Sequence, residues 1–274
     1  MGSILALSLP LLRASLVPMR LVTRPELDGL TCAVLLSQCE TVDSFEFVHP
    51  QQVRDREVDV GKDDILVCEH YLPTHPELDR YEELVRETDR LDSAQLELND
   101  VVAPAGYVLL EFTLDSKSGL EGVQEYFLDL LPAMKTRTIQ EVLDLPSVRE
   151  RARRLGEQDR RYRELAIAHS TIDEGIVVTD FRSVDPLPVG NRFLIYTVFP
   201  EATVSLRIQH GRVPDTISVS VGRSIFNRNS RANVEILMSM YGGGGQAGAG
   251  ACVLPAASAD TQIAEIIAAL KRNA

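Results

Sequence analysis

The feature that most constrains this chain is one long polar helical pattern with a different sequence texture on each side. Residues 147–166, SVRERARRLGEQDRRYRELA, mix Arg and Glu at helical spacing, which is typical of a solvated helix that joins two folded parts. Short apolar runs alternate with helical segments before it, and strand-like runs follow one another after it. We therefore predict two lobes, residues 19–145 and 167–274, joined by a helix over residues 146–166. The alternative interpretation of the Arg-rich pattern is an RNA-binding arm.

The first of these lobes begins with the pattern of an α/β unit. Residues 20–23 are predicted to form a short buried strand, Asp28 and Gly29 a turn, and residues 30–39 an apolar helix. Further strands are predicted at FEFVHP and DILVCEHY, and further helices at residues 81–90 and 125–134.

The second lobe is predicted to be α+β. Its strand-like runs are GIVVTDF, RFLIYTVF, TVSLRIQ and TISVSV, with turn residues between them. A helix is predicted over residues 231–241. After it come the glycine-rich segment GGGGQAGAGA, the strand ACVLP and a final helix over residues 260–272.

Composition excludes several classes of protein. The chain has 274 residues, of which 45% are hydrophobic, so it is too apolar for a disordered chain. No apolar stretch reaches the roughly 18 residues that a membrane-spanning helix needs, so no membrane partner is expected. A net charge of -12 argues against coating of duplex DNA. Residues 186–250, however, carry six Arg against three acidic side chains, which favours local attraction of a phosphate-bearing ligand.

The cysteines and the first residues indicate a cytoplasmic protein. The four cysteines, Cys32, Cys39, Cys68 and Cys252, show no CxxC spacing, so we expect reduced thiols rather than a zinc site or disulfides. Residues 1–18 lack the basic start of a signal peptide and contain a proline in the apolar run. We predict that Met19 is the natural start and that residues 1–18 are a non-native or disordered extension. A short membrane-targeting segment is the alternative.

The strongest candidate for a binding site is the segment GRSIFNRNSRANVEILMSMYGGGGQAGAG. Four successive glycines can take positive φ and let a ligand approach the backbone, and successive N–H groups can bind an anion. Arg and Asn side chains just upstream offer donors suited to phosphate or carboxylate. The alternative is a flexible loop that ends a helix. The predicted substrate-binding residues are Arg223, Ser224, Asn227, Arg228, Gly242, Gly243, Gly244, Gly245 and Gln246.

A candidate metal site lies near the first predicted strand. Glu26 and Asp28 stand two residues apart just past that strand, and carboxylate oxygens in such a position suit Mn²⁺ or Mg²⁺. A second acidic cluster, Asp89 and Asp92 with Ser93, follows a predicted helix. A structural turn and a helix-ending cap are the respective alternatives. A separate two-histidine site is also considered in the loop CEHYLPTHPELD, with Glu69, His70, His75 and Asp79.

Together these motifs resemble the DHH phosphoesterase superfamily from about Met19 to the C-terminus, and within it the exopolyphosphatase-related branch. The resemblance implies a parallel-sheet, metal-binding lobe joined by a linker helix to a smaller α+β substrate-binding lobe. It also implies hydrolysis of phosphodiester or phosphoanhydride bonds, assisted by Mn²⁺ or Mg²⁺, in short oligonucleotides, nucleotides or polyphosphate. The motifs that carry it are LVTRPELDGLTCAVLL, DILV, DRLDSAQL, PAGYVLLEFTLDSKSGL, GNRFLIYTVFP, GRSIFNRNS and YGGGGQAGAG.

The departures from the superfamily pattern define a second hypothesis. Val22 stands at the position of the motif's His, Gln246 replaces the His that ends the glycine loop, and the DHH triplet is missing. The resemblance implies Glu26, Asp28 and Asp92 as metal ligands, with Asp28 and Asp92 as the catalytic pair. The alternative is a degenerate relative without a metal that binds a phosphorylated ligand or nucleic acid as a regulatory protein. A homodimer is compatible with either.

Overall fold

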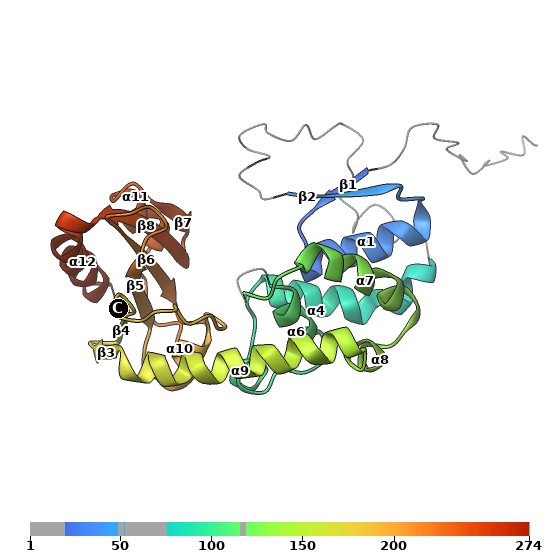
Figure 1. The fold of residues 1–274 in the computed structure, drawn as a ribbon, viewed down its shortest axis with the longest axis horizontal. Coiled ribbons are helices and arrows are strands. Elements are labelled where there is room, and N and C mark those ends of the chain that lie inside the picture. The colour runs from blue at the N-terminus through green and yellow to red at the C-terminus, as the bar shows by residue number, and fades with distance from the viewer. Residues whose placement is uncertain (1–19, 49–51, 53–75, 116–118, 274) are drawn as a thin grey trace, which may run out of the picture.

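Two sheets and the helices around them make up the described chain (Figure 1). We call the parts before and after the long helix α9 the N-terminal and the C-terminal lobe. The first contains a parallel strand pair and the second a separate mixed sheet, so the predicted α/β fold class is confirmed. The computed structural model describes residues 20–48, 52, 76–115 and 119–273.

The N-terminal lobe is built on a β-α-β unit. Strand β1 (Arg20–Thr23) pairs in parallel with β2 (Ser44–Phe47), and α1 (Leu27–Cys39) connects them. Parallel neighbours require such a crossover, and α1 supplies it with an almost wholly apolar sequence that is buried on most sides. The Phe47 ring packs edge-on against Phe127 with 5.0 Å between ring centroids, which closes the core over the strands.

Further helices pack around α1, and two of them match the predicted helices at residues 81–90 and 125–134. A capping box at Thr138, whose hydroxyl and backbone N–H both bind Glu141, begins one of the short helices. The elements in chain order are η1 (Pro76–Tyr81), α4 (Glu82–Asp92), α5 (Leu98–Val102), α6 (Gly106–Leu114), α7 (Val123–Thr136) and α8 (Ile139–Leu143).

The long polar pattern forms α9 (Pro146–Ala168), as predicted. Its first residue is a proline, which is tolerated there because the first turn has no partner for its N–H. The buried side chains Val148, Leu155 and Tyr162 recur every seven residues and form one narrow stripe. The rest of α9 is polar and runs along both lobes (Figure 1).

The C-terminal lobe is a six-stranded sheet in the order β3-β4-β5-β6-β8-β7. Only the β4–β5 pairing is parallel among its described neighbours. Its strands are β3 (Ser170–Asp173), β4 (Ile176–Asp180), β5 (Val204–His210), β6 (Thr216–Arg223), β7 (Gly244–Gln246) and β8 (Ala249–Pro255), and its helices α10 (Leu194–Val198), α11 (Val234–Ser239) and α12 (Ala256–Lys271).

The two faces of this sheet are covered differently. Helices α11 and α12 bury Met238, Ile263 and Ile266 against one face, where the alternate apolar residues of β5, β6 and β8 point. In Figure 1, α12 lies on the side turned away from the N-terminal lobe. On the other face, α9 and α10 share a core with Val177 of β4, and the Tyr196 hydroxyl of α10 bonds to Ser205 of β5 and to the Gly222 carbonyl of β6.

One element was predicted wrongly. Residues 192–199 were expected to form a strand, but Leu194–Val198 form the helix α10. The Asn191 side chain accepts the N–H of Phe193 at 2.9 Å just before the helix, which favours a helical turn at that point. The apolar run then packs in a core between lobes rather than along a sheet, and periodicity alone does not separate these two outcomes.

Smaller differences concern where elements begin. The helix expected over residues 231–241 is shorter, because Asn233 caps α11 by accepting the N–H of Ile236. The final helix begins at Ala256 rather than at residue 260. The glycine-rich segment is partly a strand, β7, instead of an open loop. The predicted strand DILVCEHY, Cys68 and residues 1–18 lie outside the described residues.

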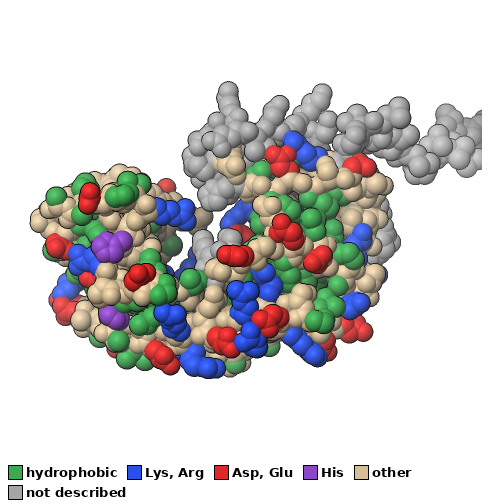
Figure 2. All heavy atoms as spheres, in the orientation of Figure 1, with side chains coloured by type: hydrophobic (Ala, Val, Ile, Leu, Met, Phe, Trp, Pro, Cys, Tyr) green, Lys and Arg blue, Asp and Glu red, His purple; other side chains and the backbone are tan. Residues whose placement is uncertain are grey.

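A shared apolar core joins the lobes. Leu96 and Phe112 from the N-terminal lobe cluster with Tyr162 of α9 and with Leu194 of α10. Beyond this core, the molecule is hollowed between the lobes, and Lys and Arg side chains are visible on both sides of the hollow (Figure 2). Within the described residues, no helix is long and apolar enough to span a membrane.

Candidate functional site

The N-terminal wall of the candidate site is the first turn of α1. Glu26 precedes the helix as its N-cap residue, and Asp28 and Gly29 lie in the first turn rather than in a separate turn as predicted. A Cβ atom on Gly29 would collide with the carbonyl oxygen of Arg24, so this glycine lets β1 and α1 approach closely. The Glu26 carboxylate forms an ion pair with Arg24.

A residue that the sequence analysis missed lies against this turn. Glu111 of α6 accepts the backbone N–H of Leu27 at 2.9 Å, and its side chain is largely buried. Burial raises the pKa of Glu111 to about 7, the hydrogen bond from Leu27 opposes the rise, and the nearby Asp115, Glu26 and Asp28 carboxylates add to it. A single charged residue in the apolar run GYVLLEFTL was the signal in the sequence.

The second predicted acidic cluster lies near the same end of the lobe. The hydroxyls of Thr31 and Thr88 share a buried hydrogen bond of 2.8 Å between α1 and α4. Figure 1 shows these helices running in opposite directions, so the start of α1 and the end of α4 lie on the side facing the C-terminal lobe. Asp92 is the last residue of α4 and is exposed, and Ser93 donates its hydroxyl to the Asp89 carbonyl at 2.7 Å.

These carboxylates do not assemble into a metal centre by themselves. Among the described residues, no group of three His, Cys, Asp or Glu side chains converges closely enough to hold a metal ion. The structure thus places Glu26 and Asp28 together at the start of α1 but does not complete a ligand set with Asp92. Of the considered histidine site, Asp79 is exposed in η1, and Glu69, His70 and His75 lie outside the described residues.

Three of the predicted substrate-binding side chains shape the loop after β6. The Ser224 hydroxyl accepts the N–H groups of Phe226 and Asn227 at 3.2 and 3.0 Å, which forms a tight turn. The Asn227 amide donates to the Glu201 carbonyl at 3.0 Å, so it holds the loop in place. Arg228 reaches the N-terminal lobe, where Nη2 donates to the carbonyl of Ala94 at 3.3 Å.

Arg223 remains available for a ligand. It is the last residue of β6, and its backbone N–H donates to the Gly248 carbonyl at 2.8 Å beside the β7–β8 turn. Its guanidinium makes no hydrogen bond or ion pair with any residue in the described part of the chain. Arg223 is half-buried and, by strand alternation, lies on the same face of the sheet as Val221. A forked cation at the end of a strand suits a phosphate oxygen.

The four glycines have different roles. Gly242 has a φ of 73°, a left-handed conformation that turns the chain from α11 into β7. A Cβ atom on Gly243 or Gly245 would collide with the backbone of β8, so these two allow the hairpin to close. Gly244 has open space where its side chain would be. Its exposed backbone is therefore the part of the segment that a ligand can approach.

The sheet presents an open polar face beside this segment. The register aligns Arg207, Ser220, Ala251 and Gly244 in one row across β5, β6, β8 and β7. The last three are exposed, and Gln246 lies on the same face by strand alternation. Because α12 covers the opposite face, this row faces the hollow seen in Figure 2.

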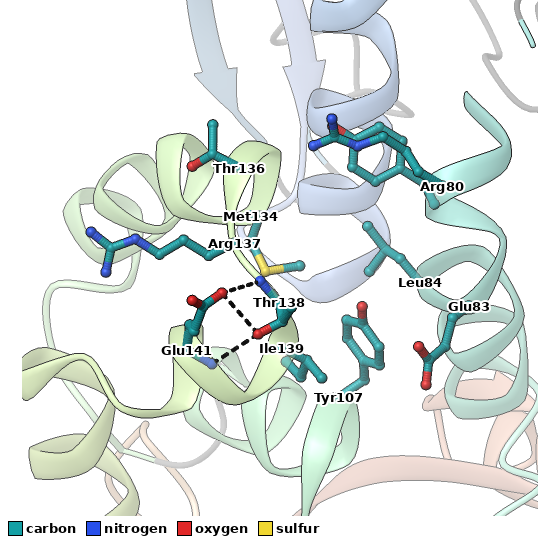
Figure 3. A pocket seen from close by; sticks show the side chains of 11 residues that line it. Arg80, Glu83, Leu84, Tyr107, Met134, Thr136, Arg137, Thr138, Ile139 and Glu141 are labelled. Carbon is teal, nitrogen blue, oxygen red and sulfur yellow. Dashed lines mark hydrogen bonds between the residues drawn. The ribbon is translucent and has the colours of Figure 1, made fainter. Parts of the chain in front are cut away.

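The N-terminal lobe contains a cavity. It has a volume of about 340 Å³ and opens between η1, α4, α6 and α8 in the N-terminal lobe (Figure 3). The labelled Arg80, Tyr107 and Glu141 line it, but Arg80 is already bonded to the Lys135 carbonyl and Glu141 is held by the Thr138 cap. None of the predicted site residues lines this cavity.

The comparison with solved structures decides the fold family. No family model matches the sequence, and no curated protein sequence does either. The structure matches a pGpG-specific phosphodiesterase, PggH from Vibrio cholerae, with a TM-score of 0.81 and 28% sequence identity. The match covers 93% of this chain and 100% of that protein. The fold is that of a DHH-type phosphoesterase. The DHH resemblance drawn from the motifs is thus supported, while the exopolyphosphatase-related branch stays a prediction.

The DHH-type fold contains both segments that border the hollow. The match covers nearly the whole chain, and in this fold the start of α1 and the glycine segment lie on the two sides of the hollow (Figure 1). The residues of this chain, rather than the fold, decide what the hollow binds.

Proposed function

We propose that the protein is a phosphodiesterase of short oligonucleotides that binds a dinucleotide in the hollow between its lobes. The observation that carries this proposal is the likeness to a pGpG-specific phosphodiesterase across nearly the whole chain. Supporting it are the exposed Gly244 backbone and the Arg223 guanidinium, which has no partner among the described residues; both suit phosphate oxygens. The chain contains no Trp, so recognition by broad aromatic stacking is a minor part of the proposal.

Hydrolysis is proposed to require Mn²⁺ or Mg²⁺. Such an ion would neutralise phosphate charge and activate a water molecule. Glu26, Asp28 and Glu111 offer oxygen donors of the right kind at the start of α1. Since no three described ligands converge, these residues alone do not fit a metal centre, and we derive no catalytic step through one.

The proposal is tested by incubating the purified protein with pGpG, with and without added Mn²⁺. We expect the loss of pGpG and the appearance of guanosine monophosphate, measured by chromatography, with a rate that rises with Mn²⁺ and falls after chelation. Calorimetry in the absence of metal should still detect binding. If pGpG binds but is never cleaved with Mn²⁺ or Mg²⁺, hydrolysis is wrong and the degenerate binding protein is the better account.

A further inference from the structure

Arg207 of β5 is a largely buried cation without an anionic partner. Its Nη2 donates to the carbonyl of Pro188 at 3.3 Å, and its guanidinium carbon lies 5.3 Å from the centre of the Phe181 ring. No ion pair joins it to any acidic residue in the described ranges. Burial lowers the pKa of Arg207, and the Tyr162 phenol opposes this. A guanidinium taken out of water in this way is costly unless an anion compensates it.

Three buried side-chain polar atoms are unpaired in the described structure, and one of them belongs to Arg207. The Nε atom of Arg207 is buried and has no hydrogen-bond partner in the described structure. The same is true of Nδ2 of Asn191 and Oε1 of Gln158. Asn191 follows Pro188 in the segment between β4 and α10. Its backbone N–H donates to the Asp159 carboxylate at 3.1 Å, and Asp159 is the residue after Gln158 in α9. Buried polar groups are normally hydrogen-bonded, so an unpaired buried guanidinium nitrogen favours a bound ligand or water at this position.

The position of Arg207 on the sheet indicates where a ligand would contact it. It stands directly across from the exposed Ser220 in the row that ends at Gly244. Three strand spacings of about 4.8 Å make this row about 14 Å long from Cα to Cα. A row of this length is long enough for a dinucleotide to lie along it. Arg207 therefore lies at the border between the covered and the open part of the face.

We infer that Arg207 forms a second anion subsite, which binds the 5′-terminal phosphate of a dinucleotide whose other end lies at the glycine segment. This inference rests on the proposed function. Stacking on Phe181 and the bond to Pro188 orient the guanidinium, so little side-chain entropy is lost when the phosphate binds.

Calorimetry with pGpG and with GpG, which lacks the terminal phosphate, tests the subsite. The wild type should prefer pGpG by about 10-fold or more, the range of a charge-assisted contact. Arg207→Gln should lose about 10-fold in affinity for pGpG and little for GpG. The matched control is Arg212→Gln, because Arg212 is an exposed arginine of the same lobe without a described partner, and it should change neither.

The outcomes separate this inference from the proposed function. If the wild type binds neither ligand, the proposed function fails. If it binds both equally, or if Arg207→Gln weakens both equally, the proposed function stands and Arg207 is only structural. Should Arg207→Gln fail to fold, Arg207→Lys takes its place, because it keeps the charge but loses the forked donors. It should weaken binding of pGpG more than binding of GpG, and equal weakening of both would overturn the subsite.

Discussion

The Glu111 carboxylate should give the protein a measurable pH dependence of stability. Its pKa rises from an ordinary 4.5 to about 7 in the folded protein, chiefly through burial. The folded state thus holds this proton more tightly than the unfolded state, and the free energy of unfolding falls as pH rises from about 4.5 to about 7. The Glu111 contribution to this fall is at most about 3 kcal/mol.

Glu111→Gln removes this titration and keeps an acceptor for the Leu27 N–H. Urea unfolding of both proteins between pH 4.5 and 8 should show the wild type losing stability relative to the variant up to pH 7, with a constant difference above. Parallel profiles over the whole range would mean that Glu111 is solvated and has no raised pKa.

Arg223 should contribute to affinity rather than to folding. Its guanidinium has no described partner, so Arg223→Ala should leave the free energy of unfolding within about 0.5 kcal/mol. A charge-assisted contact of about 1.5–3 kcal/mol predicts a loss of pGpG affinity of roughly 10- to 100-fold. Calorimetry on Arg223→Ala and on the exposed Arg212→Ala checks this, and equal affinities for both variants would remove Arg223 from the site.

At the scale of elements, the β7–β8 hairpin distinguishes two neighbouring glycines. A Cβ on Gly243 meets the Ala251 carbonyl and Cys252, whereas a Cβ on Gly244 meets nothing within 4 Å. Gly243→Ala should therefore cost about 1–3 kcal/mol of unfolding free energy, and Gly244→Ala about 0.5 kcal/mol or less.

Ligand affinity should reverse this order. Gly244→Ala places a methyl group where the backbone is exposed to the hollow, so we expect weaker pGpG binding in a protein of nearly normal stability. Denaturation and calorimetry on both variants provide the comparison. A glycine segment that only turns the chain would show no affinity change for Gly244→Ala.

Elements with regular patterns could be predicted from the sequence. The β-α-β start and α9 follow from apolar runs and from a polar helical repeat, which are local signals. The helix α10 could not, because RFLIYTVF is apolar throughout and its burial between the lobes decides its conformation. The sequence predicts Gly243 and Gly245 as part of a loop. Their close approach to the backbone of β8 is a tertiary contact, which a local sequence pattern does not show.

At the scale of the whole molecule, the candidate site combines residues that are distant in sequence. Motif residues such as Arg223 and Asp28 could be chosen as candidates from the sequence, since each stands in a recognisable segment, and their roles stay predictions. Glu111 and Arg207 could not, because a carboxylate from α6 and a guanidinium from β5 gain their roles only when the fold brings them to α1 and to the open face. Ser224 and Asn227, which the sequence predicts as ligand contacts, hold the loop with their polar atoms, and their contact with a ligand stays a prediction.

The central claim, that the hollow between the lobes cleaves a short oligonucleotide, is tested most directly by turnover of pGpG at saturating Mn²⁺. The wild type should release guanosine monophosphate. Asp28→Asn, which changes a carboxylate at the start of α1, should reduce the rate at least 10-fold with little change in pGpG affinity, and Arg212→Gln should match the wild type. The same rate in wild type and Asp28→Asn, or no release by the wild type at any Mn²⁺ concentration, would contradict the account.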